Sequence, residues 1–214
     1  MRPYPVNLHA HDALVAKYES QPIVKGGILL YGSSFFTNWQ NAAAEVAEAS
    51  AGKYTVVNHG FGGATVDELL HYYPRLVTQY EPKVIVTRVG PNDLFRGFTP
   101  EEAWMMAWRL YEFLRADFPE ARIVIFCCFE HPSAVAKNVT ERYAAFDALQ
   151  KEYAAETDNV DFVNISDFFY EKPASVGSYE GFRDIFGEDG LHLRPEIYRQ
   201  FADYFVKTME KLGI

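Results

Sequence analysis

Five short runs of apolar and β-branched residues recur along the chain and predict the strands of a sheet. The runs cover residues 26–32, 54–58, 83–90, 121–129 and 160–165. Each run is nearly continuous in hydrophobic residues, as is typical of strands buried on both faces of a parallel sheet. Segments with helical spacing and helix-forming composition separate the runs. This alternation predicts an α/β protein, a three-layer α/β/α sandwich built on a five-stranded parallel sheet.

Chain length and local signals predict how these elements are organised. A length of 214 residues is enough for one substantial hydrophobic core and short for two. We therefore expect a single domain over residues 1–214, with a helical extension at 1–25. Pro195 is predicted to open the last helix. The aperiodic segment 168–190 is predicted to be an active-site loop region, because loops of this length in a compact domain are often functional.

The charge balance argues against several classes of partner. The chain has 20 basic and 29 acidic residues, a formal net charge of -9 and no Lys/Arg cluster that could follow phosphates. A nucleic-acid partner is therefore not expected. The N-terminus lacks the apolar core and cleavage site of a signal peptide, and no apolar run approaches the roughly 20 residues needed to span a bilayer. We expect a cytoplasmic protein without membrane insertion.

The sequence offers no pattern for a metal or an organic cofactor. Its two cysteines, Cys127 and Cys128, are adjacent in the fourth apolar run, where their side chains should point to opposite faces of a strand. We interpret them as buried, reduced thiols. The six histidines show no metal-ligand spacing with nearby acids, and we interpret His9 and His11 as solvated. No cofactor and no metal are predicted.

The residues that follow the strands include the parts of a nucleophilic site. In an open parallel sheet, ligands bind beyond the carboxyl ends of the strands. Ser33 and Ser34 come directly after the first run. One of these two hydroxyls is the candidate nucleophile, and their positions leave both open. His192 is the candidate base, and Asp189 could hold its imidazole in the required tautomer.

An acyl-transfer site also needs donors for the oxyanion of the tetrahedral intermediate. The backbone N–H groups of Ser34 and Gly63 and the side-chain amide of Asn92 are the candidates. Glycine suits this role because the absence of Cβ lets the backbone approach a reacting carbonyl. Aromatic residues flank these positions. Three of them, Phe35, Phe61 and Phe95, are candidates to line a substrate pocket.

Four short blocks give the chain a resemblance to a known family. "GSSF", "NHGFGG", "GPND" and "DGLH" resemble, in this order, the four blocks of the SGNH or GDSL-type esterase and acylhydrolase superfamily, in its "GSSS"-type branch. The resemblance covers residues 27–205 and implies a flavodoxin-like α/β/α sandwich. It implies Ser34 as nucleophile with Asp189 and His192, and Gly63 and Asn92 as oxyanion donors.

Two positions depart from the family pattern. Ser33 stands where the family usually has an aspartate before the nucleophile. Pro91 occupies the variable position of the "GPND" block, where its ring should stiffen the loop that carries Asn92. Neither departure removes a member of the implied catalytic set.

The expected function is that of a serine ester hydrolase, acting through an acyl-enzyme on Ser34. Small or medium acyl esters are the expected substrates, with O-acetyl groups on a sugar among them. A lysophospholipase or thioesterase type of acylhydrolase on the same site is the alternative. From another class, "LLYGSSFFTN" resembles the phosphate loop of flavodoxins, although Phe36 stands where that loop has glycine. A non-catalytic partner with this fold, and a homo-oligomer, are left open.

Several polar residues near these blocks have a structural interpretation. Asn58 is expected to organise a turn, and Asp93 to hold its loop through backbone amides. His59 and His131 are left as alternatives that could touch a substrate.

Two arginines accompany the third apolar run. Arg88 lies in the run and Arg96 follows it. Both could steer an anionic group, but ordinary salt bridges are the favoured interpretation for both.

Overall fold

The computed structural model describes residues 7–171 and 181–214. Five parallel strands form one sheet, as the sequence predicts, and their order is β2-β1-β3-β4-β5. The strands are β1 (Ile28–Gly32), β2 (Val56–Gly60), β3 (Val84–Arg88), β4 (Arg122–Phe126) and β5 (Val160–Val163).

The register of the central strands aligns their carboxyl ends. Gly32 at the end of β1 pairs with Gly60 of β2 on one side and with Arg88 of β3 on the other. The second strand lies two residues later than the predicted 54–58, because its ladder with β1 begins at Val56. The residues that follow β1, β2 and β3 therefore emerge at one edge of the sheet.

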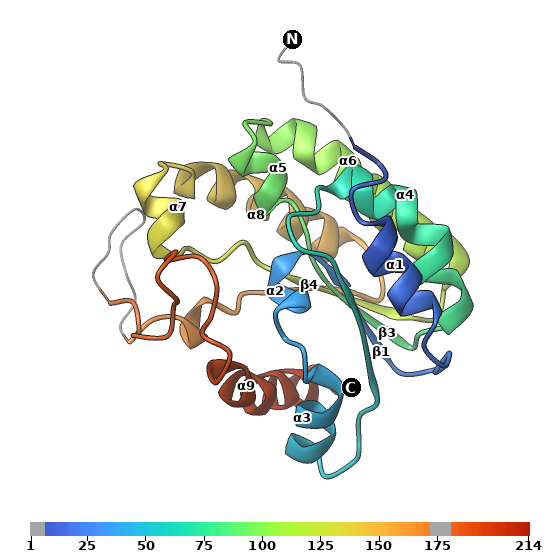
Figure 1. The fold of residues 1–214 in the computed structure, drawn as a ribbon. Helices are drawn as coiled ribbons and strands as arrows, with labels where there is room; N and C mark the ends of the chain where they lie inside the picture. The colour runs from blue at the N-terminus through green and yellow to red at the C-terminus, as the bar shows by residue number, and fades with distance from the viewer. Residues whose placement is uncertain (1–6, 172–180) are drawn as a thin grey trace.

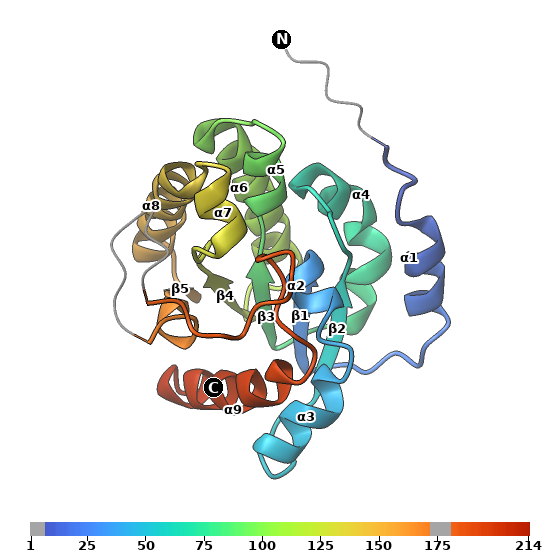
Figure 2. The same ribbon diagram turned by 60° about the vertical axis from the view of Figure 1, so that its left-hand side comes forward.

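Helices cover both faces of the sheet and give the three predicted layers (Figures 1 and 2). One face carries α1 (Asp12–Glu19), α4 (Val66–Leu76), α6 (Pro100–Asp117) and α8 (Thr140–Glu156). The other face carries α3 (Ala42–Ala49) and α9 (Ile197–Lys211). Three short helices follow strand ends: α2 (Ser34–Thr37), α5 (Pro91–Phe95) and α7 (Pro132–Ala136). Two 3₁₀ helices, η1 (Thr78–Tyr80) and η2 (Ser166–Phe168), complete the set.

Alternation along the strands divides the interior into two cores. On β3, Ile85 belongs to the core beneath α4, α6 and α8, and Val86 belongs to the core beneath α9. Cys127 and Cys128 continue this alternation past β4 and enter different cores. Both cysteines are free and buried, which confirms the prediction from their spacing.

The ends of the chain differ in detail from the predictions. The expected extension at 1–25 contains α1, and residues 1–6 lie outside the described part. The last helix begins at Ile197 instead of Pro195, because Pro195 belongs to a preceding turn in which its carbonyl accepts the Tyr198 N–H. In the predicted loop region 168–190, residues 172–180 lie outside the described residues.

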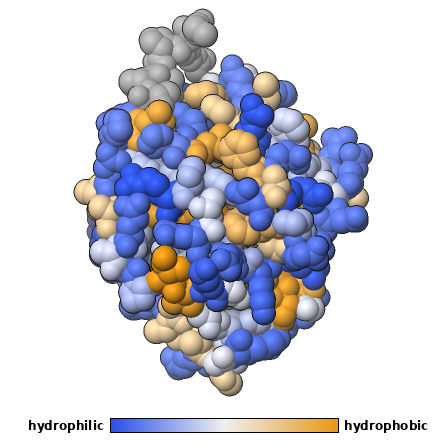
Figure 3. Space-filling model, turned by 90° about the vertical axis from the view of Figure 1, so that its right-hand side faces the viewer, coloured by the Kyte–Doolittle hydropathy of each residue, from blue (hydrophilic) through white to orange (hydrophobic). Residues whose placement is uncertain are grey.

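The face that carries α1 is mostly hydrophilic, and its hydrophobic side chains form small, separate groups (Figure 3). This face offers no broad apolar surface of the kind that marks stable interfaces. Among the helices of the described residues, none has the length and apolar character needed to cross a membrane. The expected cytoplasmic location stays a prediction.

Candidate active site

Ser34 opens α2 at the carboxyl end of β1. Ser33 is the N-cap residue and is 3% exposed, whereas Ser34 is half-buried. Neither the backbone N–H nor the hydroxyl of Ser34 donates a hydrogen bond to another described residue. The helix α2 packs closely on the end of β2, since a Cβ at Gly60 would lie 2.5 Å from the backbone nitrogen of Thr37. The two hydroxyls are therefore not equivalent, and that of Ser34 is the more accessible.

Gly63 lies in the turn between β2 and α4. Its φ of +78° falls in the left-handed region that favours glycine. A Cβ at this position would meet no atom within 4 Å, so the requirement is conformational and not steric. The Gly63 carbonyl accepts a hydrogen bond from Arg96 Nη2 at 3.0 Å, which holds the turn in place. The Gly63 N–H has no acceptor among the described residues and can bind an anion.

Asn92 lies in α5, directly after β3. Its Nδ2 donates a hydrogen bond to the carbonyl of Ala64 at 2.7 Å, which orients the amide and leaves its second hydrogen for a ligand. The neighbouring Asp93 carboxylate accepts the Val66 N–H at 3.2 and 3.3 Å. Burial raises the pKa of Asp93 to about 7, against the opposing effect of these backbone hydrogen bonds. Asp93 thus joins α5 to the start of α4, as the sequence predicts.

Asp189 and His192 form a closed turn with a direct side-chain contact. Asp189 Oδ2 lies 2.6 Å from His192 Nδ1. Asp189 Oδ1 accepts the backbone N–H groups of Leu191 and His192 at 2.9 and 3.0 Å. Partial burial alone would raise the pKa of Asp189, but these hydrogen bonds outweigh it and lower the pKa to about 2. The carboxylate is therefore ionised at neutral pH and receives the Nδ1 proton of His192.

The second ring nitrogen of His192 is available for chemistry. His192 Nε2 is buried and has no hydrogen-bond partner within residues 7–171 and 181–214. Because the proton on Nδ1 is directed at Asp189, Nε2 carries a lone pair. A buried, unpaired imidazole nitrogen oriented by a carboxylate is the arrangement of a general base.

The loop that carries this pair is docked on the start of α7. The Gly190 carbonyl accepts the backbone N–H of Ser133 at 2.9 Å. His131 is the N-cap of α7, and its Nδ1 accepts the Ala134 N–H at 3.1 Å. Burial, with the positive charge of Arg88, lowers the pKa of His131 to about 3, so the ring is neutral. His131 is fully buried, so its assignment as a residue that could touch substrate was wrong.

Sequence reasoning missed this role of His131. Pro132 in the first turn of α7 was the available signal, because proline at that position places the preceding residue at the N-cap. Histidine is not among the residues that favour the N-cap, which weakens the signal.

These groups share one edge of the sheet. Ser34 follows β1, Gly63 follows β2 and Asn92 follows β3, and the register aligns the ends of all three strands. The segment that carries His192 passes beside α2 in both Figures 1 and 2. Tyr198 of α9 donates a hydrogen bond to a backbone carbonyl of α2 at 3.0 Å, which fastens the two segments together.

This sheet edge lies within the part of the chain that matches a known family. Residues 27–200 match the GDSL-like Lipase/Acylhydrolase family. The chain belongs to this family. The match spans all five strands and both sides of the site, and it makes the protein an ester hydrolase. The flavodoxin-like binding module and the non-catalytic partner, both left open from the sequence, are set aside.

Relatives of this GDSL-like hydrolase carry the names of several activities. "Thioesterase 1/protease 1/lysophospholipase L1" from Escherichia coli (strain K12) is 24% identical over 191 residues, which cover 86% of this chain and 84% of the relative. A GDSL-like lipase from Bacteroides thetaiotaomicron superposes with a TM-score of 0.70 at 14% identity, covering 96% of this chain and 100% of that one. A mutant acetyl-xylooligosaccharide esterase from Geobacillus Stearmophilus gives 0.66 at 17% identity, with 87% and 95% covered.

Two of the three aromatic residues predicted to line a pocket are core residues of this hydrolase. Phe35 is 5% exposed and packs edge-on against Phe201 of α9, with ring centroids 5.0 Å apart. Phe61 is fully buried and packs against Tyr72 of α4. Phe61 offers no surface to a substrate, so its prediction was wrong, whereas the small exposed part of Phe35 leaves its prediction untested. Phe95 is half-buried and stays a candidate.

Two histidines also lie elsewhere than expected. His59 is 1% exposed, and its Nδ1 lies 2.8 Å from the Leu76 carbonyl, so it does not face a substrate. His11 is not solvated, because its Nε2 lies 3.6 Å from a carboxylate oxygen of the buried Glu68. Asn58 organises the α2 segment as predicted, since its Nδ2 donates to two carbonyls there. Among the described residues, no group of three or more His, Cys, Asp or Glu side chains could hold a metal ion.

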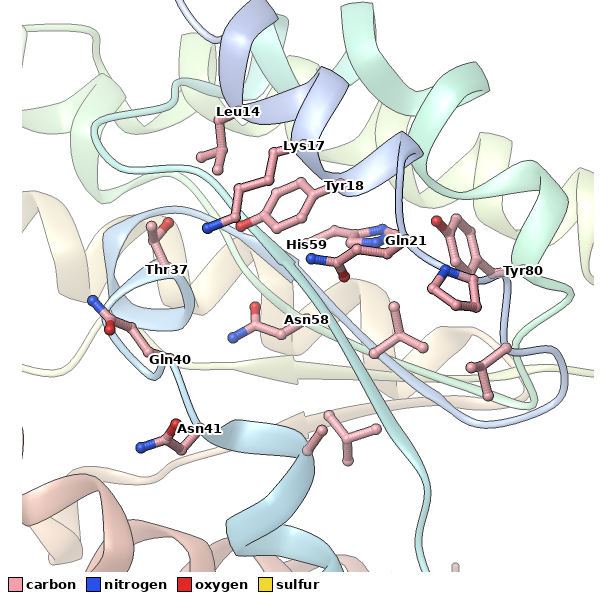
Figure 4. A pocket seen from close by; sticks show the side chains of 15 residues that line it. Leu14, Lys17, Tyr18, Gln21, Thr37, Gln40, Asn41, Asn58, His59 and Tyr80 are labelled. Atoms are coloured by element: carbon pink, nitrogen blue, oxygen red, sulfur yellow. The ribbon is translucent and has the colours of Figure 1, made fainter.

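A separate pocket of about 720 Å³ lies along the edge strand β2 (Figure 4). Side chains from α1, including Lys17, face Thr37 and Gln40 across the strand, and Asn58 and His59 form its floor. None of the predicted catalytic or oxyanion residues lines this pocket. It is therefore distinct from the site at the carboxyl ends of the strands.

Proposed function

We propose that this hydrolase cleaves small or medium acyl esters through an acyl-enzyme on Ser34. The observation that carries the proposal is the Asp189–His192 pair, with 2.6 Å between Oδ2 and Nδ1 and an unpaired Nε2. An oriented base is what a serine hydroxyl needs to become a nucleophile. The accessible hydroxyl of Ser34 on the same sheet edge supplies that nucleophile.

In the acylation half of the reaction, the Ser34 oxygen attacks the ester carbonyl and its proton moves to His192 Nε2. Asp189 stabilises the imidazolium formed and keeps the ring in place. The protonated His192 then donates this proton to the departing alkoxide, and the carbonyl carbon–oxygen bond to the alcohol breaks. An acyl group remains on Ser34.

In the deacylation half, water replaces the alcohol. His192 accepts a proton from the water as it attacks the acyl carbonyl, and returns a proton to the Ser34 oxygen as the carboxylic acid leaves. In both halves the negative charge on the tetrahedral oxygen is stabilised by the N–H groups of Ser34 and Gly63 and by the free amide hydrogen of Asn92. The free enzyme is regenerated.

The packing around the site supports short acyl groups. Phe35 beside the nucleophile and Phe61 beside the oxyanion turn are both committed to the core, so neither adds much apolar surface for a long chain. The acetyl-xylooligosaccharide esterase among the structural neighbours acts on acetyl groups of a sugar, which agrees with O-acetyl sugars as substrates. The curated relative with lysophospholipase and thioesterase names favours the alternative of longer acyl chains.

An acyl-chain series tests the proposed substrate range. We expect kcat/KM for p-nitrophenyl esters to reach its maximum between acetate and butyrate and to gain nothing by octanoate, because a methylene that stays in water contributes none of the about 0.8 kcal/mol that burial would give. Acetylated xylooligosaccharides and palmitoyl-coenzyme A, assayed in parallel, separate sugar deacetylation from thioesterase activity. A maximum at octanoate or longer would instead establish the lysophospholipase or thioesterase alternative.

The Asn92 amide has a measurable share in the proposed reaction. Asn92→Ala should lower kcat by about 10²- to 10³-fold with a smaller change in KM, because the donor acts on charge that develops in the transition state. Initial-rate assays over a range of p-nitrophenyl acetate concentrations measure both kcat and KM. Asn58→Ala is a useful comparison, since it removes another half-buried amide, one that organises the α2 segment. Equal losses in the two variants would show that Asn92 acts through local structure.

A further inference from the structure

Arg88 is a buried cation at the last position of β3. Only 5% of its surface is exposed. Its Cα pairs with that of Gly32 at the end of β1, two residues before Ser34. Neighbouring strands lie about 4.8 Å apart, so this arginine stands beside the strand that presents the nucleophile. Side chains alternate along β3, and Arg88 therefore shares with Val86 the face that is covered by α9.

The contacts of the guanidinium place it between the two halves of the proposed catalytic site. Its central carbon lies 4.1 Å from the ring centroid of Phe129 and 5.3 Å from that of Phe35. Phe35 is adjacent to Ser34 in α2. The Phe129 ring lies 6.1 Å from that of His131, which caps the helix that docks the His192 loop. The guanidinium thus approaches α2 from one side and the anchor of the base loop from the other.

No carboxylate of the described residues lies within ion-pair distance of Arg88, although the charge of Arg88 opposes the rise in the pKa of the buried Asp147 carboxyl. Its Nε is buried without a hydrogen bond, and no ion pair involves the residue. Arg122, which is half-buried, donates two hydrogen bonds to Asp161. The salt bridge expected for Arg88 from the sequence is therefore absent among the described residues. A buried guanidinium gains from the faces of two aromatic rings, but its donors still require acceptors.

We propose that Arg88 binds an anionic group of the substrate, so that the enzyme prefers esters with a carboxylate close to the scissile bond. This inference rests on the proposed function, because it takes Ser34 as the point of attack. The planar guanidinium matches the two oxygens of a carboxylate and pairs most strongly where water is excluded. The formal net charge of -9 repels anions from most of the surface, which leaves a local cation such as Arg88 to attract one.

The anionic group could belong to either half of the ester, and matched substrates separate the two cases. Monoethyl succinate carries a carboxylate in the acyl half, and ethyl succinamate is its neutral isostere. Acetoxyacetate carries it in the alcohol half, and acetoxyacetamide is the corresponding neutral ester. Acid release in a pH-stat gives kcat/KM for all four.

In the wild type we expect kcat/KM for the carboxylate ester of one pair to exceed that for its neutral counterpart by about 10- to 100-fold. This is the effect expected when a charge-assisted hydrogen bond is replaced by a neutral one. Arg88→Gln should abolish this ratio. Arg88→Lys should retain part of it, because the charge remains while the paired donors are lost. Arg199→Gln is the matched control, since it removes an exposed arginine of α9 that pairs with Asp203 and Glu48. This control should keep the wild-type ratio.

A measurement on the wild type alone keeps the test valid if the Arg88 variants do not fold. Succinate should inhibit turnover of p-nitrophenyl acetate competitively, at a concentration at least tenfold below that of succinamide. Ratios near one for both substrate pairs, or equal inhibition by succinate and succinamide, would overturn the role of Arg88. Equal fold decreases for both members of a pair in Arg88→Gln, which leave their ratio at the wild-type value, would do the same. Ester hydrolysis that depends on Ser34 would stand in all these cases.

Discussion

Ser34→Ala is expected to lower kcat/KM for p-nitrophenyl acetate by about 10⁴-fold or more, to the level that oxyanion donors and binding alone can sustain. We expect the variant to fold like the wild type, because the Ser34 hydroxyl donates no hydrogen bond to another described residue that its removal could break. The measurement is steady-state hydrolysis, with circular dichroism and a thermal unfolding curve to verify the fold.

Ser33→Ala is the matched control for this experiment. It removes the neighbouring hydroxyl of Ser33, a residue that is 3% exposed and is the N-cap of α2. We expect its activity to stay within about threefold of wild type, since Ser33 forms no side-chain capping hydrogen bond. A fluorophosphonate probe followed by peptide mass spectrometry should label Ser34 in wild type and in Ser33→Ala. The opposite pattern, with activity and labelling lost in Ser33→Ala, would make Ser33 the nucleophile.

Asp189→Asn is expected to lower kcat by about 10⁴-fold while leaving the loop intact. An asparagine oxygen can still accept the Leu191 and His192 backbone N–H groups that Asp189 Oδ1 accepts at 2.9 and 3.0 Å. Its amide nitrogen, however, would face His192 Nδ1 and favour the tautomer with the proton on Nε2, which removes the base. Charge stabilisation of the imidazolium is lost at the same time.

The pH dependence separates this mechanism from a structural one. The pKa of Asp189 is lowered to about 2 in the folded protein, so its carboxylate is ionised throughout the range from pH 5 to 9. Protonation of Asp189 itself should therefore not contribute to the pH dependence of the wild type in that range, and Asp189→Asn should stay far below wild type from pH 7 to 9. Asp184→Asn is the control, because it neutralises an exposed carboxylate of the same loop that pairs with Arg194. Activity of Asp189→Asn close to that of wild type from pH 7 to 9, or an equal deficit in Asp184→Asn, would contradict the role given to Asp189.

The sequence predicts the strands and much of the candidate site because both depend on local patterns. Continuous apolar runs identify all five strands, and chain direction then places the residues after each strand at one edge. The Asp189–His192 contact is also local, since three residues separate the partners and the turn closes on itself.

The burial of side chains near the site was less predictable. Phe35 and Phe61 lie next to proposed catalytic residues in the sequence, yet they turn into opposite cores, because neighbouring positions in a turn can face either way. The docking of Gly190 on Ser133 joins segments that no sequence pattern connects. The sequence could not predict that Arg88 lacks an ion pair, because this depends on which carboxylates lie nearby in space and not on their spacing along the chain.

The short span of the Asp189–His192 turn has a consequence for the order in which the site assembles during folding. Closing a loop of three residues costs little entropy, so this pair can form early and independently of the sheet. The nucleophile lies near the other end of the chain, and it reaches the pair only after β1, β3 and β4 have paired across distant parts of the sequence. Contacts between remote segments form slowly. A partly folded chain therefore holds an oriented imidazole without its serine, and ester hydrolysis should be among the last properties to return on refolding.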